Sequence, residues 1–388
     1  MARPTSAGPM TIEQLLAAKA VVVTCGSGGV GKTTTAAAAA AMAAAHLGGK
    51  VLVLTVDPAR RLANALGLEQ FGNVETQVPR SAFEAAGVEP RGELWAAMLD
   101  TKKSWDDLIR QHAPDDETRD AILANPLYQN ITGKFVQSHD YIAMERLYEI
   151  HAAGRYDLVI VDTPPTRNAI DFLEAPDRMA DFFSSRLLRW LTAPYRSRLV
   201  NFASKPFYTV ADRILGSQFL EDIAEFFLLF QTMYAGFIER STEVSRLLGD
   251  PMTTFVVVST LEPAPAREAE FFIDALADRG LNLGAVLCNK TLPPTLLDAE
   301  AAAVAERLRS DSAAVVAAAD IPGDADVEAR VLEEVAESFL NYRVVATRES
   351  EQRAELATHA ELVASVPTLR DDIHDLAGLL AMGEQFWR

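Results

Sequence analysis

The sequence predicts an α/β fold in which a mostly parallel sheet is covered by helices on both faces. Continuous apolar runs recur along the 388 residues, and stretches of helical character separate them. Because these runs do not alternate with polar residues, they are typical of strands that are buried on both faces. The predicted strands are residues 21–25, 51–56, 157–161, 255–258, 285–287 and, with a weaker apolar pattern, 362–366.

The first predicted strand leads directly into a glycine-rich loop. Residues 26–33 read Gly-Ser-Gly-Gly-Val-Gly-Lys-Thr, which fits the G-x-x-x-x-G-K-[ST] pattern of a phosphate-binding loop. An alanine-rich stretch follows as far as Leu47 and is ended by two glycines, which predicts a helix with a glycine cap. Strand, loop and helix therefore occur in the order that phosphate binding requires, which disfavours the alternative of a glycine-rich turn with a stray lysine. We expect a P-loop NTPase fold that binds a nucleoside triphosphate.

The residues of this loop have distinct expected roles. Successive backbone N–H groups and the N-terminus of the following helix face the phosphate oxygens. Lys32 is expected to neutralise the β- and γ-phosphates, and the Thr33 hydroxyl is expected to ligate Mg²⁺. The predicted nucleotide-binding residues of the loop are Gly28, Gly29, Val30, Gly31, Lys32, Thr33 and Thr34.

Further polar residues follow predicted strands at the carboxyl edge of the sheet, where α/β folds bind ligands. Asp162 is expected to hold Mg²⁺ through a water, with a helix N-cap as the alternative. Asp57 is expected at the same metal site, where it would orient or deprotonate the attacking water; the alternative is a turn before Pro58. Asn289 is expected to pair with the adenine edge while Lys290 lies along the base, and a simple turn is the alternative.

Two stretches belong to no predicted strand, and both are expected to be helical insertions in a single domain of residues 1–388. Residues 100–150 are interrupted by two prolines, whereas residues 172–250 are rich in phenylalanine. The second stretch carries an apolar stripe at helical spacing, formed by Leu220, Ile223, Phe227, Phe230, Tyr234 and Phe237. This stripe either forms the core of a helical subdomain or offers a groove to an apolar client. Residues 298–337 are expected to be solvated helices of the α/β layer.

Composition disfavours several functional classes. A net charge of −18 argues against non-specific binding of nucleic acid, which requires a basic surface. The two cysteines, Cys25 and Cys288, lie in predicted core strands and form no disulfide framework, which favours a reducing, cytoplasmic setting. The sequence has neither a signal-peptide pattern nor an apolar run long enough to span a bilayer.

The motifs GSGGVGKTT, VDPAR and VDTPPTRNAIDFL together resemble those of the ArsA-type ATPases. That family includes arsenite-efflux ATPases and the targeting factor of the GET pathway for tail-anchored membrane proteins. The resemblance covers most of the chain and implies a Mg²⁺-dependent ATP hydrolase that works as a dimer, with nucleotides facing each other across the interface. It further implies that Asp57 is the switch I aspartate that activates water, Asp162 the switch II aspartate, and Asn289 the residue that reads adenine. Pro367 falls in the segment that lies beside the base.

The chain departs from this family pattern at three places. Ser27 stands where the family has a signature lysine that reaches the phosphates of the partner subunit; Arg60, Arg61 and Arg167 are candidate substitutes. In switch II, residues 166–169 read Thr-Arg-Asn-Ala instead of Thr-Gly-His-Thr, so its coupling to the helical insertions is expected to differ. The metalloid-binding cysteines of the efflux enzymes and the paired zinc cysteines of the eukaryotic targeting factor are absent, and As(III), Sb(III) or a structural zinc would require such thiolate ligands.

The favoured function is an ATP hydrolase whose dimer cycle handles hydrophobic protein segments, as a chaperone or in membrane-protein targeting. One alternative is the ATPase subunit of an anion or metalloid efflux system, and another is a weakly hydrolysing nucleotide-binding regulatory subunit. Because a homodimer would lack the lysine in trans, a heterodimer with a paralogue that carries it is favoured. Hydrophobic client helices and a peripheral membrane partner are compatible with this function, and nucleic acid is not an expected partner.

Overall fold

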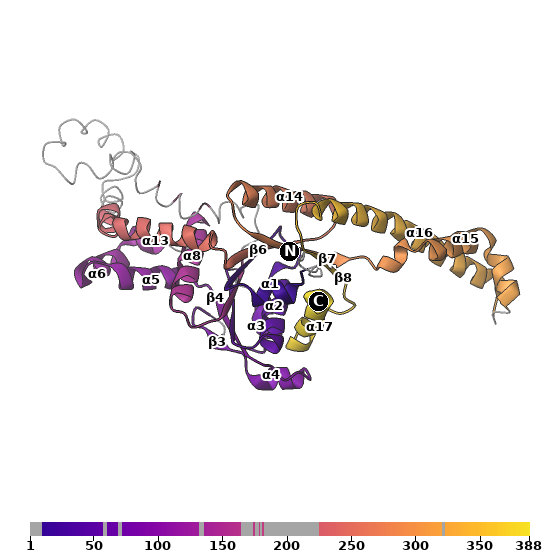
Figure 1. Ribbon diagram of the computed structural model, residues 1–388, viewed down its shortest axis with the longest axis horizontal. Coiled ribbons are helices and arrows are strands. Elements are labelled where there is room, and N and C mark those ends of the chain that lie inside the picture. Colours follow the sequence, from indigo (N-terminus) through magenta and orange to yellow (C-terminus); the bar gives the residue numbers. More distant parts are fainter. Residues whose placement is uncertain are drawn as a thin grey trace, which may run out of the picture.

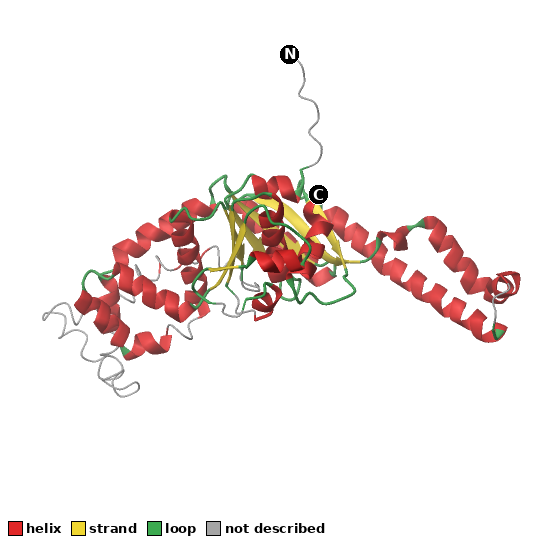
Figure 2. Cartoon of the chain, turned by 90° about the horizontal axis from the view of Figure 1, so that it is seen from below, coloured by secondary structure: helices red, strands yellow, loops and turns green. Residues whose placement is uncertain are grey.

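A computed structural model describes most of the chain (Figure 1). The described residues are 10–56, 60–68, 72–131, 136–163, 225–319 and 323–388, together with 174, 178 and 181. A central sheet lies between a group of helices at one end of the molecule and a long helical hairpin at the other (Figures 1 and 2).

Eight strands form one sheet in the order β3-β4-β2-β5-β1-β6-β7-β8. All neighbouring pairs are parallel except β3 with β4, which confirms the predicted, mostly parallel sheet. The strands are β1 (Val21–Cys25), β2 (Lys50–Thr55), β3 (Thr76–Gln77), β4 (Glu93–Met98), β5 (Leu158–Asp162), β6 (Thr253–Ser259), β7 (Leu283–Thr291) and β8 (Val363–Pro367). The apolar runs of the sequence therefore predicted every strand except β3 and β4.

Helices cover both faces of the sheet, as predicted. Alternate residues of β1 enter different cores: Val22 belongs to one cluster of buried side chains, and Val21 and Val23 belong to the other. The helices on the Val22 face are α1 (Ile12–Ala17), α2 (Lys32–His46), α3 (Arg60–Ala65), α4 (Arg80–Ala85) and α17 (Leu376–Trp387). The helices that pack on the other face are α5 (Thr101–His112), α8 (Val136–Ala152), α13 (Tyr234–Leu248) and α14 (Pro263–Asp278).

The alanine-rich helix α2 begins at the end of the glycine-rich loop and is almost entirely buried. It ends with Leu47 as its cap, and Gly48 follows with a φ of 84°, so the predicted glycine stop is confirmed. Because most side chains of α2 are alanines, neighbouring elements can approach the helix closely on every side. Helix α17 is one such close neighbour. A Cβ at Gly383 of α17 would lie 2.2 Å from Cγ of Met42. Small side chains therefore fix α2 between the sheet and α17.

The helices α5, α8 and α13 form a helical subdomain with an aromatic core, together with α6 (Asp116–Ala124) and α7 (Pro126–Ile131). Of the predicted phenylalanine-rich stripe, Phe230 and Phe237 are buried against Trp105 of α5, and Phe227 is half-buried. Leu220 and Ile223 lie outside the described residues, as does the side chain of Tyr234. The described part of the stripe thus belongs to a packed core.

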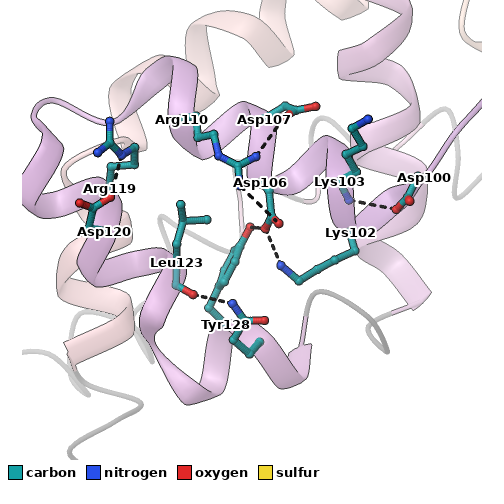
Figure 3. Close-up of polar contacts among 11 residues, drawn as sticks. Asp100, Lys102, Lys103, Asp106, Asp107, Arg110, Arg119, Asp120, Leu123 and Tyr128 are labelled. Atoms are coloured by element: carbon teal, nitrogen blue, oxygen red, sulfur yellow. Dashed lines mark hydrogen bonds and ion pairs between the residues drawn. The ribbon is translucent and has the colours of Figure 1, made fainter. Parts of the chain in front are cut away.

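A polar network joins three helices of this subdomain, α5, α6 and α7 (Figure 3). Tyr128 donates its hydroxyl to Oδ1 of Asp106 at 2.7 Å, and Lys102 donates to the same oxygen at 2.5 Å. The Lys102 ammonium also lies 4.9 Å from the centre of the Tyr128 ring. Burial, followed by the hydrogen bond to Asp106, raises the pKa of Tyr128 far above its usual value, so its hydroxyl is a permanent donor.

The prediction that residues 298–337 belong to the α/β layer is wrong. These residues form α15 (Ala299–Ala319) and the first part of α16 (Ala325–Leu356), and these helices are not a layer on the sheet. They pack against each other as a hairpin that projects away from the sheet (Figures 1 and 2). An amphipathic, alanine-rich helix can bury its apolar face against a sheet or against another helix. The sequence pattern alone therefore did not distinguish these two kinds of packing.

The helical subdomain contains a buried ion pair whose loss should destabilise the fold. Glu145 of α8 pairs with Arg240 of α13, and their side chains are 1% and 13% exposed. Replacing Glu145 by Gln leaves the Arg240 charge without its counter-ion in the core. We expect a loss of about 3 kcal/mol in the free energy of unfolding, measured by urea denaturation.

The matched control is the exposed pair Arg246–Glu243, which also involves α13 and has side chains 69% and 36% exposed. Glu243→Gln should change the free energy of unfolding by less than about 0.5 kcal/mol, because water screens and solvates both charges. Equal effects of the two substitutions would contradict a structural role for the buried pair.

Candidate functional site

The glycine-rich loop turns sharply at two positions whose positive φ angles favour glycine. Gly31 has a φ of 95° and caps α2, and Gly29 has a φ of 82°. A Cβ at Gly31 would lie 2.3 Å from Nδ2 of Asn289, whereas a Cβ at Gly29 would meet nothing within 4 Å. The N-terminus of α2 therefore opens onto the loop in the geometry that binds phosphate.

Asp162 joins the three elements that meet at the carboxyl edge of the sheet. Its side chain is fully buried at the end of β5. Its Oδ2 accepts a hydrogen bond from Thr33 of α2 at 2.6 Å and another from Thr55 of β2 at 2.9 Å. A threonine hydroxyl in contact with a carboxylate is the oxygen pair that a P-loop site uses to hold Mg²⁺.

Lys32 lies along the loop with its charge inside it. The side chain is 6% exposed, and its Nζ donates to the carbonyl oxygen of Ser27 at 2.9 Å. The Ser27 side chain is also buried, and its hydroxyl makes no hydrogen bond with any described residue. The ammonium group is therefore held at the loop by its backbone, where it is placed to neutralise a bound phosphate.

Asn289 and Lys290 bind the same loop from β7. Asn289 donates its amide to the carbonyl oxygen of Val30 at 2.8 Å and accepts the Lys290 N–H at 2.9 Å. Lys290 has a φ of 57°, which is rare for a residue with a side chain, and its Nζ donates to the carbonyl oxygen of Gly29 at 3.2 Å. The loop is thereby fixed from the side opposite Asp162.

A pocket of about 970 Å³ opens beside the loop. Most of the predicted nucleotide-binding residues line it: Gly28, Gly29, Gly31, Lys32, Thr33, Thr34, Asn289 and Pro367. Val30 does not line the pocket, because its side chain is buried behind the loop. Asp57 and Arg167 lie outside the described residues, as do the side chains of Arg60 and Arg61.

Of one wall of this pocket, the sequence predicted only Pro367. The segment after β8, including Thr368, Asp371, Asp372 and His374, faces the loop across the pocket. Thr163 also lines it, and donates its hydroxyl to the Thr24 carbonyl oxygen at 2.8 Å. The segment after β8 carries no motif, and only its position after a strand on the same edge of the sheet could have indicated it.

The two cysteines are poor metal ligands in this fold. Both are buried in β1 and β7. Burial raises the pKa of the Cys25 thiol far above its usual value despite the neighbouring Lys32 charge, and burial raises the pKa of Cys288 to about 11. Both are therefore protonated at neutral pH, whereas a metalloid or zinc ligand must be a thiolate.

The residues present fit a magnesium nucleotide. The positive-φ glycines and the start of α2 suit phosphate oxygens, Thr33 and Asp162 suit Mg²⁺, and the pocket has room for a nucleoside. A sequence profile of a family described as anion-transporting ATPases matches residues 19–317, which is most of the chain. The chain belongs to the ArsA ATPase family. The predicted family and fold class are thus confirmed, and this ArsA-family chain is an ATPase.

Curated relatives of this ArsA-family ATPase are distant. ATPase GET3 of Malassezia globosa is 26% identical over 305 residues, which are 74% of this chain and 78% of the relative. ATPase GET3 of Komagataella phaffii is 26% identical over 278 residues, covering 69% and 71%. A protein provisionally named arsenical pump-driving ATPase 1 of Aquifex aeolicus is 23% identical over 285 residues, covering 72% and 65%. In the described part of the ArsA-family chain, no helix combines the length and apolar character needed to cross a membrane.

Two glycines of the loop should respond differently to alanine. Gly31→Ala would strain the backbone and also drive a Cβ into Asn289, whereas Gly29→Ala would cause backbone strain of about 1 kcal/mol alone. We expect Gly29→Ala to weaken ATP binding by about tenfold or less, and Gly31→Ala to weaken it much more. Calorimetric titration with ATP measures both. Equal losses would contradict the close packing of Asn289 on Gly31.

Proposed function

We propose that this ATPase hydrolyses Mg²⁺-ATP at the pocket beside residues 28–34 and uses the cycle to handle hydrophobic protein segments. The observation that best supports this hydrolytic site is the pair of hydrogen bonds that Asp162 accepts from Thr33 and Thr55. It joins the loop to the ends of two strands, so a change at the phosphates reaches β5 and β2 directly.

The residues of this site have distinct proposed roles in ATP binding and hydrolysis. Lys32 and the loop N–H groups bind and orient the β- and γ-phosphates, and Asn289 binds the adenine edge. Thr33 and Asp162 would hold Mg²⁺, which when bound would neutralise charge on the phosphate oxygens. Asp57 accepts a proton from the attacking water. The segment with Pro367 covers the base.

The link to the helical subdomain is physical. Helix α8 directly precedes β5, whose last residue is Asp162. Val161 of β5, Leu147 of α8 and Phe237 of α13 belong to one continuous buried cluster. A shift at the end of β5 is therefore expected to move the helices packed on it, since packed cores transmit displacements.

Two observations favour the handling of hydrophobic protein segments over metalloid transport as the function of ATP hydrolysis. The buried, protonated Cys25 and Cys288 offer no thiolate to a metalloid. Two of the relatives reported above are named GET3, and the motif resemblance connects such ATPases with tail-anchored membrane proteins. We therefore infer a client with an apolar helix and a cytoplasmic site of action.

The proposed active form is a heterodimer. Ser27 has a short, uncharged side chain where the family pattern has a lysine that reaches across the dimer. A homodimer would lack this cation in both sites, whereas a paralogue with the lysine would supply it to the site on this chain. The site on this chain would then be the fast one.

Mixing experiments test the heterodimer. This chain alone should hydrolyse ATP slowly, and addition of the paralogue should raise the rate by on the order of 10³-fold, because a cation supplied in trans stabilises the transition state. Lys32→Ala on this chain should abolish the gain, while the equivalent substitution on the paralogue should have little effect. Full-speed hydrolysis by this chain alone would contradict the heterodimer.

Binding of a labelled helical peptide tests the client. A peptide with 20 apolar residues should bind the heterodimer more tightly with a non-hydrolysable ATP analogue than with ADP. The control peptide carries two aspartates at its centre and should not bind. Stimulation of the ATPase rate by arsenite, without peptide binding in either nucleotide state, would instead support efflux.

A further inference from the structure

Helix α16 carries an apolar face that no described residue covers. α16 has 32 residues and turns one side toward α15, with Ala329, Ala336 and Ala346 buried there. About a third of a turn away lies a second row, which we call the α16 stripe: Val327, Val331, Val335, Ser338, Tyr342 and Val345. Its valines and tyrosine are 45% to 59% exposed, and no charged residue occupies a position within the row.

The spacing of the α16 stripe is that of a coiled-coil seam. From Val331 to Val345 its members follow each other at steps of four, three, four and three residues. This stretch is about 21 Å long at 1.5 Å per residue. Single exposed valines are common on protein surfaces. A continuous apolar row at this spacing is instead typical of a helix that packs against another helix.

The central side chains of the stripe, Val335 to Val345, fit a second copy of the same helix running in the opposite direction. In that arrangement Val335 of one copy faces Val345 of the other, and the small Ser338 faces the large Tyr342. Each contact occurs twice because the arrangement is symmetric. In this register Val331 of each copy lies opposite Glu349 of the other, whose carboxylate already accepts the Leu292 N–H of its own chain. The apolar part of the seam therefore runs from Val335 to Val345, over about 15 Å.

Charge selects this register and direction. Glu334 and Arg348 are both exposed and border the stripe on the side away from α15. Antiparallel pairing brings Glu334 of each copy opposite Arg348 of the other, whereas Asn341 faces its own equivalent. A shift by one heptad would place Glu334 opposite Asn341 or Glu355. Parallel pairing would place Tyr342 on Tyr342 and would leave both charges without a partner across the seam.

We propose that the α15–α16 hairpin is a self-association arm, which pairs antiparallel with the same hairpin of a second copy. The half-buried Leu332 and Phe339 lie between the stripe and α15, so pairing would cover them too and give a four-helix bundle. The surface is remote from the nucleotide pocket and goes beyond the proposed heterodimer: it would join two ATPase units, whatever their composition.

Cysteine pairs test this arrangement in the full chain. The double variant Val335→Cys/Val345→Cys should form a covalent dimer under mild oxidation, because each cysteine faces the other one across the seam. Neither single variant should do so, since each new cysteine then lies opposite a valine. The native thiols are buried and should stay unreacted. Linking by the single variants would indicate parallel pairing, and absence of linking in all three would show that a different protein, or none, covers the stripe; both results overturn the proposal.

Charge reversal provides an independent measurement that needs no oxidation. Glu334→Arg or Arg348→Glu should weaken self-association about tenfold, because two attractive pairs become repulsive. The double reversal should restore it. The control, Glu337→Arg, alters an exposed charge outside the seam and should have no effect. Sedimentation velocity without nucleotide gives the masses, and failure of the double reversal to restore association would overturn the proposal.

Discussion

The carboxylate of Asp162 is the contact on which the geometry of this ATPase depends. It is fully buried, yet it accepts hydrogen bonds from Thr33 at the start of α2 and Thr55 at the end of β2. A buried carboxylate is stable only where hydrogen-bond donors surround it, so the start of α2 and the ends of β2 and β5 must meet at the same place. The parallel sheet provides this, because β5 lies between β1 and β2 with their carboxyl ends aligned.

The glycine-rich loop is held from its other side by Asn289, whose amide reaches the Val30 carbonyl oxygen from β7. Between Asp162 and Asn289 the loop has little freedom, and the buried alanines of α2 hold the helix behind it close to the sheet. A site fixed in advance by packing and hydrogen bonds does not need to reorganise when it stabilises charge. The rigidity of α2 is thus part of the chemistry that the pocket supports.

The two helical extensions of the sheet differ in how they are attached. The helical subdomain shares one buried cluster with the sheet, from Val161 of β5 to Trp105 and Phe237. The α15–α16 hairpin instead builds a contact surface between its own two helices and leaves the sheet (Figure 2). The first extension is placed to follow movements of β5, whereas the second is placed to make contacts at a distance from the pocket.

The sequence by itself determined the elements whose signal is local. The apolar runs of β1, β2, β5, β6 and β7, the glycine-rich loop, and the polar residues at strand ends each follow from a few adjacent side chains. Only the tertiary structure decided that Glu93–Met98 is a strand, because its alanines have weak strand preference and β2 supplies the pairing. It also decided that the segment after β8 forms a wall of the pocket and that residues 298–337 leave the sheet. These outcomes depend on which surface a segment meets, and an amphipathic helix or an alanine-rich strand carries the same pattern whichever surface that is.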